Sequence, residues 1–491
     1  MINKASFLLC LGLVIAAPVL PGATQSIQLD ESLLENFSWR SVGPPGAGGR
    51  IIDVDVVGEF PYTIFVAGAT GGLWRSVNNG VTFEPLFDHE GTNSIGAIAI
   101  HPTNPDIIWV GTGENNARNS VSWGDGVYKS TDGGESWTNL GLRNSHHIGD
   151  ILVDPTDPET VYVAALGHFW GASEERGVYK TTDGGESWER VLFIDENSGV
   201  VDLAMDARDS GTLYAAAYQV QRDGFSGGNP ETMYGPGSGI YKTSDGGRSW
   251  KELARGLPPG EKGRIGLAVS QTDPEIVYAI VQTATSVGAP RDPDIPADPD
   301  PAPPRTMRDG GVFRSSDRGE SFEWVNGINP RPFYYSQIRV DPSDPDRVYV
   351  LGGSVAVSDD GGENFENLRM NVHVDHHDLW IDPANPDHLV LGNDGGLYFS
   401  YDRGATWDFL NQMALGQFYA IDVDMRDPYY IYGGVQDYMS WAGPSATRNS
   451  IGITTSDWYK VMTGDGFQVR IDPTDPNIVY AESQGGGLIR H

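Results

Sequence analysis

Short apolar runs separated by Gly- and Asp-rich turns recur along this chain, and helical periodicity is scarce. The recurring unit is an apolar run, an Asp-Pro-type turn and a second apolar run, as in residues 151–153, Asp154-Pro155 and residues 160–164. Runs of Val, Ile, Tyr and Phe bounded by turn residues are typical of β-strands. The nine copies of this strand pair begin near Ile51, Ile95, Ile148, Val201, Ile265, Ile338, Leu379, Ile421 and Val469.

A second motif, Ser/Thr-x-Asp-x-Gly-x-x-aromatic, follows seven of these pairs and is named the Asp box. Its full copies begin at Ser130, Thr181, Thr243, Ser315, Ser358 and Ser400, and a weaker copy at Ser76 carries Asn78 instead of the Asp. We expect the Asp to accept hydrogen bonds from its own turn, the Gly to adopt a positive φ, and the aromatic to point inward. The Asp box is therefore predicted to be a folding device and not a site.

Each repeat holds four short strands, which predicts an all-β fold, a β-propeller of four-stranded antiparallel blades. We expect a lead-in strand over residues 25–44 and a seven-bladed propeller over residues 45–415. Residues 416–491, whose two strand pairs lack Asp boxes, are predicted to form the first two blades of a second, truncated propeller. The alternative is one ring of nine or more blades, in which residues 37–42 add an outer strand and hide an open sheet edge.

The N-terminus has the pattern of an export signal. Lys4 precedes an apolar stretch over residues 5–20 that is too short to span a bilayer, so residues 1–24 are predicted to be a signal peptide. The protein is therefore expected to be secreted or periplasmic, without a membrane span. The single cysteine, Cys10, lies in this segment, so the mature chain would have neither disulfides nor thiolate chemistry.

Charge narrows the choice of partners. The formal net charge of −33 disfavours nucleic acid and anionic membrane surfaces. Many carboxylates fall in turns, where Asp is a common turn former, so the acidity is otherwise interpreted as a solvated surface. We expect a monomer that binds a protein or polysaccharide ligand.

The Asp boxes resemble the bacterial neuraminidase repeats shared by sialidases, xyloglucan-cleaving endoglucanases and sortilin-type receptor propellers. The whole chain after the signal segment resembles exported bacterial proteins described as sortilin-like or glycosyl-hydrolase-like repeat proteins. The segments that carry this resemblance are Gly111-Thr-Gly-Glu-Asn115, Arg331-Pro-Phe-Tyr-Tyr335, His373-Val-Asp-His-His377, Gly392-Asn-Asp-Gly-Gly396, Gly433-Gly-Val-Gln-Asp437 and Gly464-Asp-Gly-Phe467. One departure from the family pattern is Tyr438-Met-Ser-Trp441, where Asn-Gly-Ser-Trp is usual.

Blade topology sorts the loops into two faces. The Asp-Pro turns and Asp boxes share one face, named the turn face, and the irregular polar loops converge on the opposite face, named the loop face. Variable loops on a regular scaffold commonly carry function. A carboxylate pair about 5–10 Å apart could supply the acid and base of glycoside hydrolysis. The candidates are Glu114, Asp394, Asp437 and Asp465, with Asp150 as a further carboxylate expected on this face.

Other side chains of the loop face are candidates for binding. Those that could stack on a sugar ring or hold a peptide are Trp170, Arg222, Tyr334, Tyr335 and Phe418, with Trp123 and Phe169 beside them. If residues 373–378 are extended, His373, Asp375 and His377 share one face and could bind a divalent metal. No other cofactor is implied.

Two functions follow from these observations. The favoured one is a secreted, sortilin-like propeller that binds a protein or glycan on its loop face, because no paired-carboxylate motif stands out. The alternative is a glycoside hydrolase that cleaves a β-linked polysaccharide in a cleft between two propellers. A sialidase is disfavoured, since its Phe-Arg-Ile-Pro segment is absent and the nearest early match is Gly49-Arg-Ile-Ile52. A Ser–His–Asp hydrolase is also disfavoured, because there is no Gly-x-Ser-x-Gly turn between a strand and a helix.

Overall fold

The computed structural model describes residues 40, 42–43, 49–58, 61–225, 228–284, 309–410 and 412–491. The expected signal peptide and most of the lead-in segment, including the proposed strand over residues 37–42, lie outside the described residues. The chain divides into two units, Met1–Ser41 and Val42–His491, and every described strand belongs to the second. No helix in the described ranges is long and apolar enough to cross a membrane.

The described strands form eight four-stranded sheets and one three-stranded sheet, all antiparallel and consecutive along the chain. They are named blades 1 to 9. Blades 1 to 4 are β1 (Ile51–Val56), β2 (Ile64–Gly68), β3 (Gly72–Ser76) and β4 (Glu84–Pro85); β5 (Ile95–Ile100), β6 (Ile108–Thr112), β7 (Val127–Ser130) and β8 (Thr138–Asn139); β9 (Ile148–Val153), β10 (Val161–Ala165), β11 (Gly177–Thr181) and β12 (Glu189–Leu192); β13 (Ser198–Asp206), β14 (Asp209–Gln219), β15 (Gly239–Thr243) and β16 (Lys251–Leu253).

Blades 5 to 9 continue the same order from inner to outer strand. They are β17 (Ile265–Val269), β18 (Val277–Val281), β19 (Gly311–Ser315) and β20 (Glu323–Asn326); β21 (Gln337–Asp341), β22 (Asp344–Leu351), β23 (Ala356–Ser358) and β24 (Glu366–Asn367); β25 (His376–Ile381), β26 (Leu389–Asn393), β27 (Gly396–Ser400) and β28 (Asp408–Leu410); β29 (Phe418–Val423), β30 (Tyr430–Val435), β31 (Ser440–Pro444) and β32 (Tyr459–Met462); β33 (Val469–Ile471), β34 (Val479–Ser483) and β35 (Gly487–Arg490). Short 3₁₀ turns are η2 (Arg143–Ser145), η4 (Thr455–Asp457) and η5 (Gln484–Gly486).

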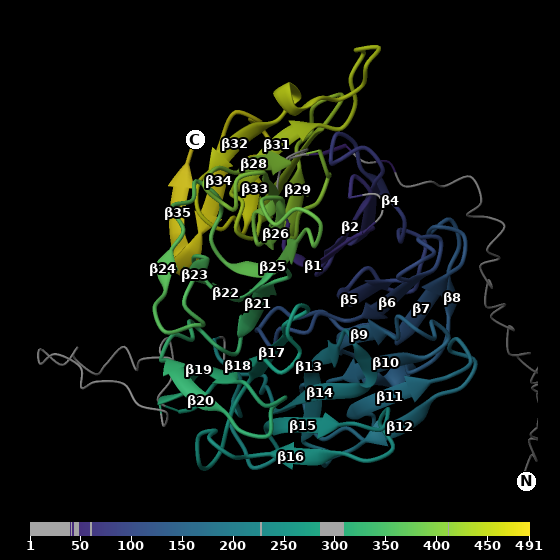
Figure 1. Ribbon diagram of the computed structural model, residues 1–491. Helices are drawn as coiled ribbons and strands as arrows, with labels where there is room; N and C mark the ends of the chain where they lie inside the picture. The colour runs from purple at the N-terminus through teal and green to yellow at the C-terminus, as the bar shows by residue number, and fades with distance from the viewer. Residues whose placement is uncertain are drawn as a thin grey trace, which may run out of the picture. The chain divides into compact units, whose positions relative to one another are not determined.

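The first seven blades close into a ring. Val54 of β1 and Val66 of β2 are fully packed in one apolar core with Val390 of β26 and Phe399 of β27. The inner strands β1 and β25 accordingly lie beside each other (Figure 1). Blade 1 therefore follows blade 7 around the axis, which confirms the seven-bladed propeller and not a single ring of nine.

Blades 8 and 9 have an apolar core of their own. Tyr432 and Ala442 of blade 8 pack with Val469 and Ala481 of blade 9. The assignment of residues 416–491 to a second propeller stays a prediction.

Aspartates on the inner strands connect three pairs of consecutive blades, 1–2, 3–4 and 4–5, through backbone hydrogen bonds. The bonds run from Ile98 N to Asp53 Oδ2 (2.7 Å), from Leu203 N to Asp150 Oδ2 (3.0 Å) and from Leu267 N to Asp202 Oδ2 (2.7 Å). Burial, with the neighbouring charge of Asp202, raises the pKa of Asp150 to about 7. Asp150 is therefore part of the ring's framework, which corrects its expected place among the loops.

The Asp boxes adopt the expected turn. Asp132 Oδ1 accepts hydrogen bonds from Ser136 N at 2.9 Å and Ser130 Oγ at 2.8 Å. Hydrogen bonds, those from Ser136 first, lower the pKa of Asp132 to about 2. Trp137 packs on the core of blades 1 and 2, and its indole N–H donates to Leu86 O of blade 1 at 2.8 Å. Each full turn thus caps its own hairpin and anchors to a neighbouring blade.

The weak first box works in the same way. Asn78 Oδ1 accepts the backbone N–H of Thr82 at 2.9 Å, as the Asp does in the other copies. In the box of blade 3, Gly184 has φ 68° and donates to Glu159 O in the Asp-Pro turn of the same blade. Positive φ is the region that favours glycine. The two kinds of turn therefore share one face, as the topology predicts.

Candidate functional site

A buried ion pair lies on the loop face where blades 1 and 2 meet. Arg50 directly precedes β1, and its Nε lies 3.0 Å from Oε1 of Glu114, which follows β6. Neither side chain is more than 3% exposed. Burial raises the pKa of Glu114, and the charge of Arg50 opposes that rise. Removing Arg50 would leave the Glu114 carboxylate buried without its ion-pair partner.

Asp394, between β26 and β27, joins the same network from blade 7. Its Oδ2 accepts the Tyr334 hydroxyl at 2.7 Å, and its Oδ1 lies 2.6 Å from His377 Nε2. Arg50 Nη1 and Arg118 Nη1 each lie 3.9 Å from Oδ2. Burial alone would raise the pKa of Asp394, but His377 and the two guanidinium groups outweigh it and hold that pKa well below its usual range. Asp394 is thus a carboxylate at all ordinary pH.

The network continues across the axis. Asn116 Nδ2 lies 3.2 Å from His377 Nδ1, and Arg264 Nη1 donates to Asn116 Oδ1 at 2.6 Å. Burial lowers the pKa of Arg264 to about 10. Side chains from blades 1, 2, 5 and 7 therefore fill this part of the loop face with ion pairs and hydrogen bonds.

This arrangement corrects the expected metal cluster. Asp375 has φ 66° and β25 begins only at His376, with an irregular register before Asp378, so His373, Asp375 and His377 do not share one extended face. Asp375 instead accepts a hydrogen bond from Tyr335, and His377 is bound to Asp394. Within the described ranges, no group of three or more His, Cys, Asp or Glu side chains is placed to hold a metal ion.

Asp437 and Asp465 form a second carboxyl pair in blade 8. Asp437 follows β30 and Asp465 follows β32, and the Asp437 backbone N–H donates to Asp465 Oδ1 at 2.6 Å. Gln436 Nε2 donates to Asp437 Oδ2 at 2.8 Å. Burial, followed by the charges of Asp394 and Asp465, raises the pKa of Asp437 to about 7. A half-buried carboxyl whose pKa is raised by burial and by neighbouring carboxyls is a characteristic acid–base arrangement.

Hydrogen bonds connect the two groups of carboxyls. Arg50 Nη2 donates to Gln417 Oε1 at 3.0 Å, and the backbone O of Gln417 accepts Gln436 N at 2.9 Å. Ser120, on the loop after β6, donates to Gln436 Oε1 at 3.5 Å. Hydrogen bonds therefore join the buried network of Arg50, Glu114 and Asp394 to the Asp437 loop of blade 8, and the two form one continuous site.

The four candidate carboxyls thus gather as expected, but in two different states. Glu114 and Asp394 are buried and paired, whereas Asp437 and Asp465 are half-buried at the edge. Sequence reasoning missed the partners, Arg50 and Arg118 above all. The one signal was an Arg placed directly before an apolar inner strand, which says nothing of what it contacts.

The aromatic and basic candidates divide in the same way. Tyr334, Tyr335 and Arg222 are at most 2% exposed, so they are packed inside the loop face and not open to a ligand. Arg222, for example, donates to the backbone O of Ala117 at 2.7 Å. Trp170 and Phe418 are 44% and 38% exposed and stay accessible.

A stack of rings borders the carboxyl site. Trp123 is 63% exposed and stacks on His146 with ring centroids 6.0 Å apart, and His146 stacks on His168 at 3.8 Å. Glu114 N donates to the backbone O of Ser122, next to Trp123, at 3.1 Å. An exposed ring platform therefore begins one residue from the network.

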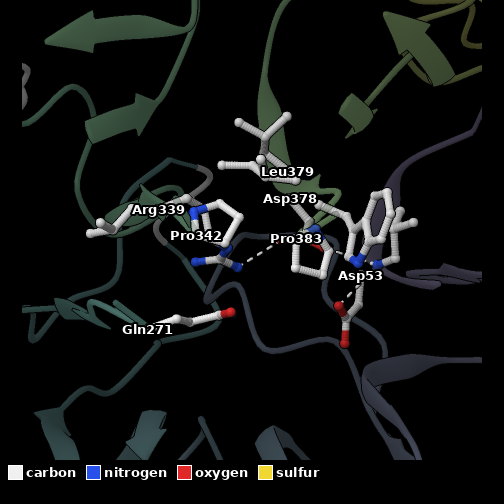
Figure 2. A pocket seen from close by; sticks show the side chains of 11 residues that line it. Asp53, Gln271, Arg339, Pro342, Asp378, Leu379 and Pro383 are labelled. Carbon is white, nitrogen blue, oxygen red and sulfur yellow. Dashed lines mark hydrogen bonds and ion pairs between the residues drawn. The ribbon is translucent and has the colours of Figure 1, made fainter. Parts of the chain in front are cut away.

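A cavity of about 300 Å³ lies on the turn face, beside Pro342 and Pro383 of the Asp-Pro turns. Arg339 and Asp378 reach into it and form an ion pair of 2.7 Å, with Asp53 nearby (Figure 2). Asp53 and Asp378 are carboxylates that connect inner strands of neighbouring blades through backbone hydrogen bonds. The cavity therefore belongs to the ring's framework and not to the loop-face site.

Comparison with known proteins gives one family. The family model described as Sortilin-Vps10 (Sortilin, neurotensin receptor 3) matches residues 125–282 and 310–457.

Among curated proteins, the chain is similar to a xyloglucanase of Paenibacillus sp, at 24% identity over 92% of this chain and 53% of that protein. It is similar to the xyloglucanase Xgh74A of Acetivibrio thermocellus at 24% identity, over 72% of this chain and 42% of the other. The chain thus spans about half the length of these curated relatives. The GH74 xyloglucanase of Xanthomonas campestris has a similar structure, with a TM-score of 0.58 and 17% identity over 92% of this chain and 74% of that one. That likeness shows the propeller fold.

Proposed function

This chain belongs to the Sortilin-Vps10 family, and we propose that it is a glycoside hydrolase acting on a β-linked polysaccharide of the xyloglucan class. The observation that carries the proposal is the pKa of Asp437, raised to about 7 by burial and by the neighbouring carboxylates Asp394 and Asp465. The relatives named as xyloglucanases support the substrate class.

In this proposal Asp437 is the general acid and Asp465 the basic carboxylate. Below pH 7 the Asp437 carboxyl holds a proton, which it gives to the glycosidic oxygen as the bond to the sugar carbon breaks. Asp465 acts either as the base that removes a proton from the attacking water or as the nucleophile that attacks that carbon itself. Asp394 is 2% exposed and does not touch substrate; together with burial, which has the larger effect, its charge raises the pKa of Asp437.

Exposed rings on loops of the first ring would bind the polysaccharide. Trp123 and Trp170 offer large flat surfaces with little loss of conformational entropy on binding, and the apolar face of a pyranose packs on such rings. Loops of the first ring and the Asp437 loop of blade 8 line the same area, which fits a chain-like substrate lying across both.

The test is release of reducing ends from xyloglucan and a panel of β-glucans. The wild type should cleave, and Asp437→Asn and Asp465→Asn should each lower kcat by about 10²-fold or more. Asp408→Asn, an exposed aspartate on β28, is the matched control and should be unchanged. Folded wild-type protein that cleaves none of the panel, or an Asp437→Asn variant with full activity, would overturn the proposal.

Binding without cleavage is the second candidate. It is favoured by the closed state of Glu114 and Asp394, whose side chains are no more than 1% exposed and so cannot reach a substrate. In that case xyloglucan or a protein ligand would bind with a measurable heat in calorimetry, Trp123→Ala would weaken binding, and no reducing ends would appear. Export and the monomeric state stay predictions, which N-terminal sequencing of the secreted protein and sedimentation would test.

A further inference from the structure

Gln436 belongs to the Gly433–Asp437 segment and touches the acid of the proposed reaction directly. Its side chain is buried, at 4% exposure, and its amide lies between Asp437 Oδ2 (2.8 Å) and Ser120 Oγ (3.5 Å). Its backbone N–H is occupied by Gln417 O at 2.9 Å. Neither proposed function gives this residue a role.

We propose that Gln436 is a positioning residue that decides which oxygen of Asp437 carries the acid proton. The amide N–H occupies Oδ2, which leaves the proton on Oδ1. With the proton on Oδ1, the bare Oδ2 can only accept a hydrogen bond, so the amide must present its N–H to that oxygen. Ser120 can donate to the other end of the amide, which fits this orientation. The inference rests on the proposed function for its chemistry, but the orientation itself does not.

The proton balance of the step is simple. The proton on Oδ1 passes to the glycosidic oxygen, which takes the electron pair of the breaking C–O bond. Asp437 becomes a carboxylate, and its Oδ2 then accepts a charge-assisted bond from Gln436, which is stronger than the bond to the neutral acid. Where Asp465 is the base, it takes the proton that the attacking water loses, and exchange with solvent then restores the proton of Asp437 and the carboxylate of Asp465. Where Asp465 is the nucleophile, the water that cleaves the glycosyl ester returns the proton to Asp437. Gln436 therefore makes Asp437 a better proton donor without touching substrate.

The loop around Asp437 is held without the Gln436 side chain. Asp437 and Met439 have φ 59° and 74°, a region that costs L residues energy and persists where the surroundings impose it. Met439 N donates to Gly464 O at 2.9 Å, and Val435 N donates to Met439 O at 2.8 Å. Replacing the amide with an apolar group of similar size should therefore leave the loop in place.

Several charged groups act on Asp437, and all must stay unchanged for the test. Asp394 and Asp465 raise its proton affinity, while Arg118 on the loop after β6 lowers it. Arg50 and the Tyr419 hydroxyl lie in the same field. Replacing the neutral Gln436 removes one hydrogen bond and no charge, so its effect is separable from theirs.

The test is a titration of Asp437 in the ligand-free protein, followed by ¹³C NMR of labelled aspartate carboxyls, with Asp437→Asn identifying the signal. Gln436→Met removes a bond that favours the ionised form, so the pKa of Asp437 should rise by about 1. Gln436→Leu is the second variant, in case the first does not fold. Gln484→Met is the matched control, since Gln484 Oε1 binds the Asp465 backbone N–H at 3.0 Å and not Asp437.

The outcomes separate cleanly. A higher pKa of Asp437 in the Gln436 variants, with no change in Gln484→Met, supports the proposal. A lower pKa would mean that the amide oxygen accepts the acid proton, and an unchanged pKa would mean that the contact is absent; either overturns it. The titration needs no substrate, so a protein that cleaves nothing would refute the proposed function and still decide this question. If cleavage occurs, the alkaline limb of kcat/KM should move upward with the pKa while KM stays constant.

Discussion

The carboxylate of Asp378 on β25 accepts a hydrogen bond from the backbone N–H of Val54 on β1 at 2.9 Å. An equivalent hydrogen bond connects blades 1 and 2, where Asp53 Oδ2 accepts the backbone N–H of Ile98. Ring closure between the first and seventh blades therefore uses the same kind of aspartate–backbone hydrogen bond that connects blades 1 and 2, 3 and 4, and 4 and 5. This hydrogen bond and the shared apolar core connect the two ends of the ring.

We expect Asp378→Ala to destabilise the ring. The substitution removes the acceptor of Val54 N and the partner of Arg339, 2.7 Å away. A lost hydrogen bond to a buried charge costs about 2 kcal/mol. Chemical denaturation should show this loss. The control is Asp422→Ala, because Asp422 binds only its own strand's Val423 N at 2.9 Å and, more weakly, Arg470 at 3.6 Å; an equal loss there would contradict the closure role.

Stability should fall as the pH rises from about 4 to 6, in part through Asp55. Burial raises the pKa of Asp55 to about 6 although Ile100 N and Val56 N oppose the rise. The folded state then binds more protons than the unfolded one, so this contribution is present below the unfolded pKa and is lost as the pH passes the folded pKa. The side chain is partly hydrated, so we expect about 1 kcal/mol.

The measurement is the slope of the unfolding free energy against pH from 4 to 7, in wild type and Asp55→Asn. The variant loses one acceptor and should be less stable at every pH, but its slope should be shallower. An identical slope in the two proteins would rule out this role.

Neutralising Asp394 should lower the pH at which cleavage declines. Its charge is the second cause, after burial, of the raised pKa of Asp437. In the wild type, kcat/KM should fall above pH 7 as the acid loses its proton. In Asp394→Asn that decline should begin at lower pH, because the ionised form of Asp437 is less disfavoured. A thermal melt of the variant establishes that it is folded, and an unmoved alkaline limb would refute the coupling.

Arg50→Met should cost about 3–5 kcal/mol, because Glu114 would then be a buried charge without its partner. Adding Glu114→Gln to Arg50→Met should recover much of this loss. Urea titrations of the two single variants and the double variant form the cycle that measures the coupling. Strict additivity of the two single effects would mean that the pair does not interact.

Blade count and turn chemistry were predictable because they depend on neighbours in the sequence. A hydrogen bond such as Ser136 N to Asp132 Oδ1 joins residues four apart, and strand pairs such as β9 and β10 are joined by one short turn. Local contacts leave a periodic mark on the chain, and that mark sufficed to identify the blades and the face that carries the turns.

Which blades meet at ring closure, and whether each carboxyl is paired, depend instead on contacts between residues far apart in the sequence. Asp437 and Glu114 both lie in polar loop segments. Nothing in the sequence distinguishes the Glu114 carboxyl, which pairs with Arg50, from the Asp437 carboxyl, which is half-buried at the edge of the site. The error over His373, Asp375 and His377 has the same origin, since a single positive φ at Asp375 changes which way its neighbours point. The sequence by itself determined the repeated blades, whose hydrogen bonds are local. Only the tertiary structure decided which charges meet, because ring closure brings together Arg50 and Asp394 from opposite ends of the ring and blade 8 adds Asp437 beside them.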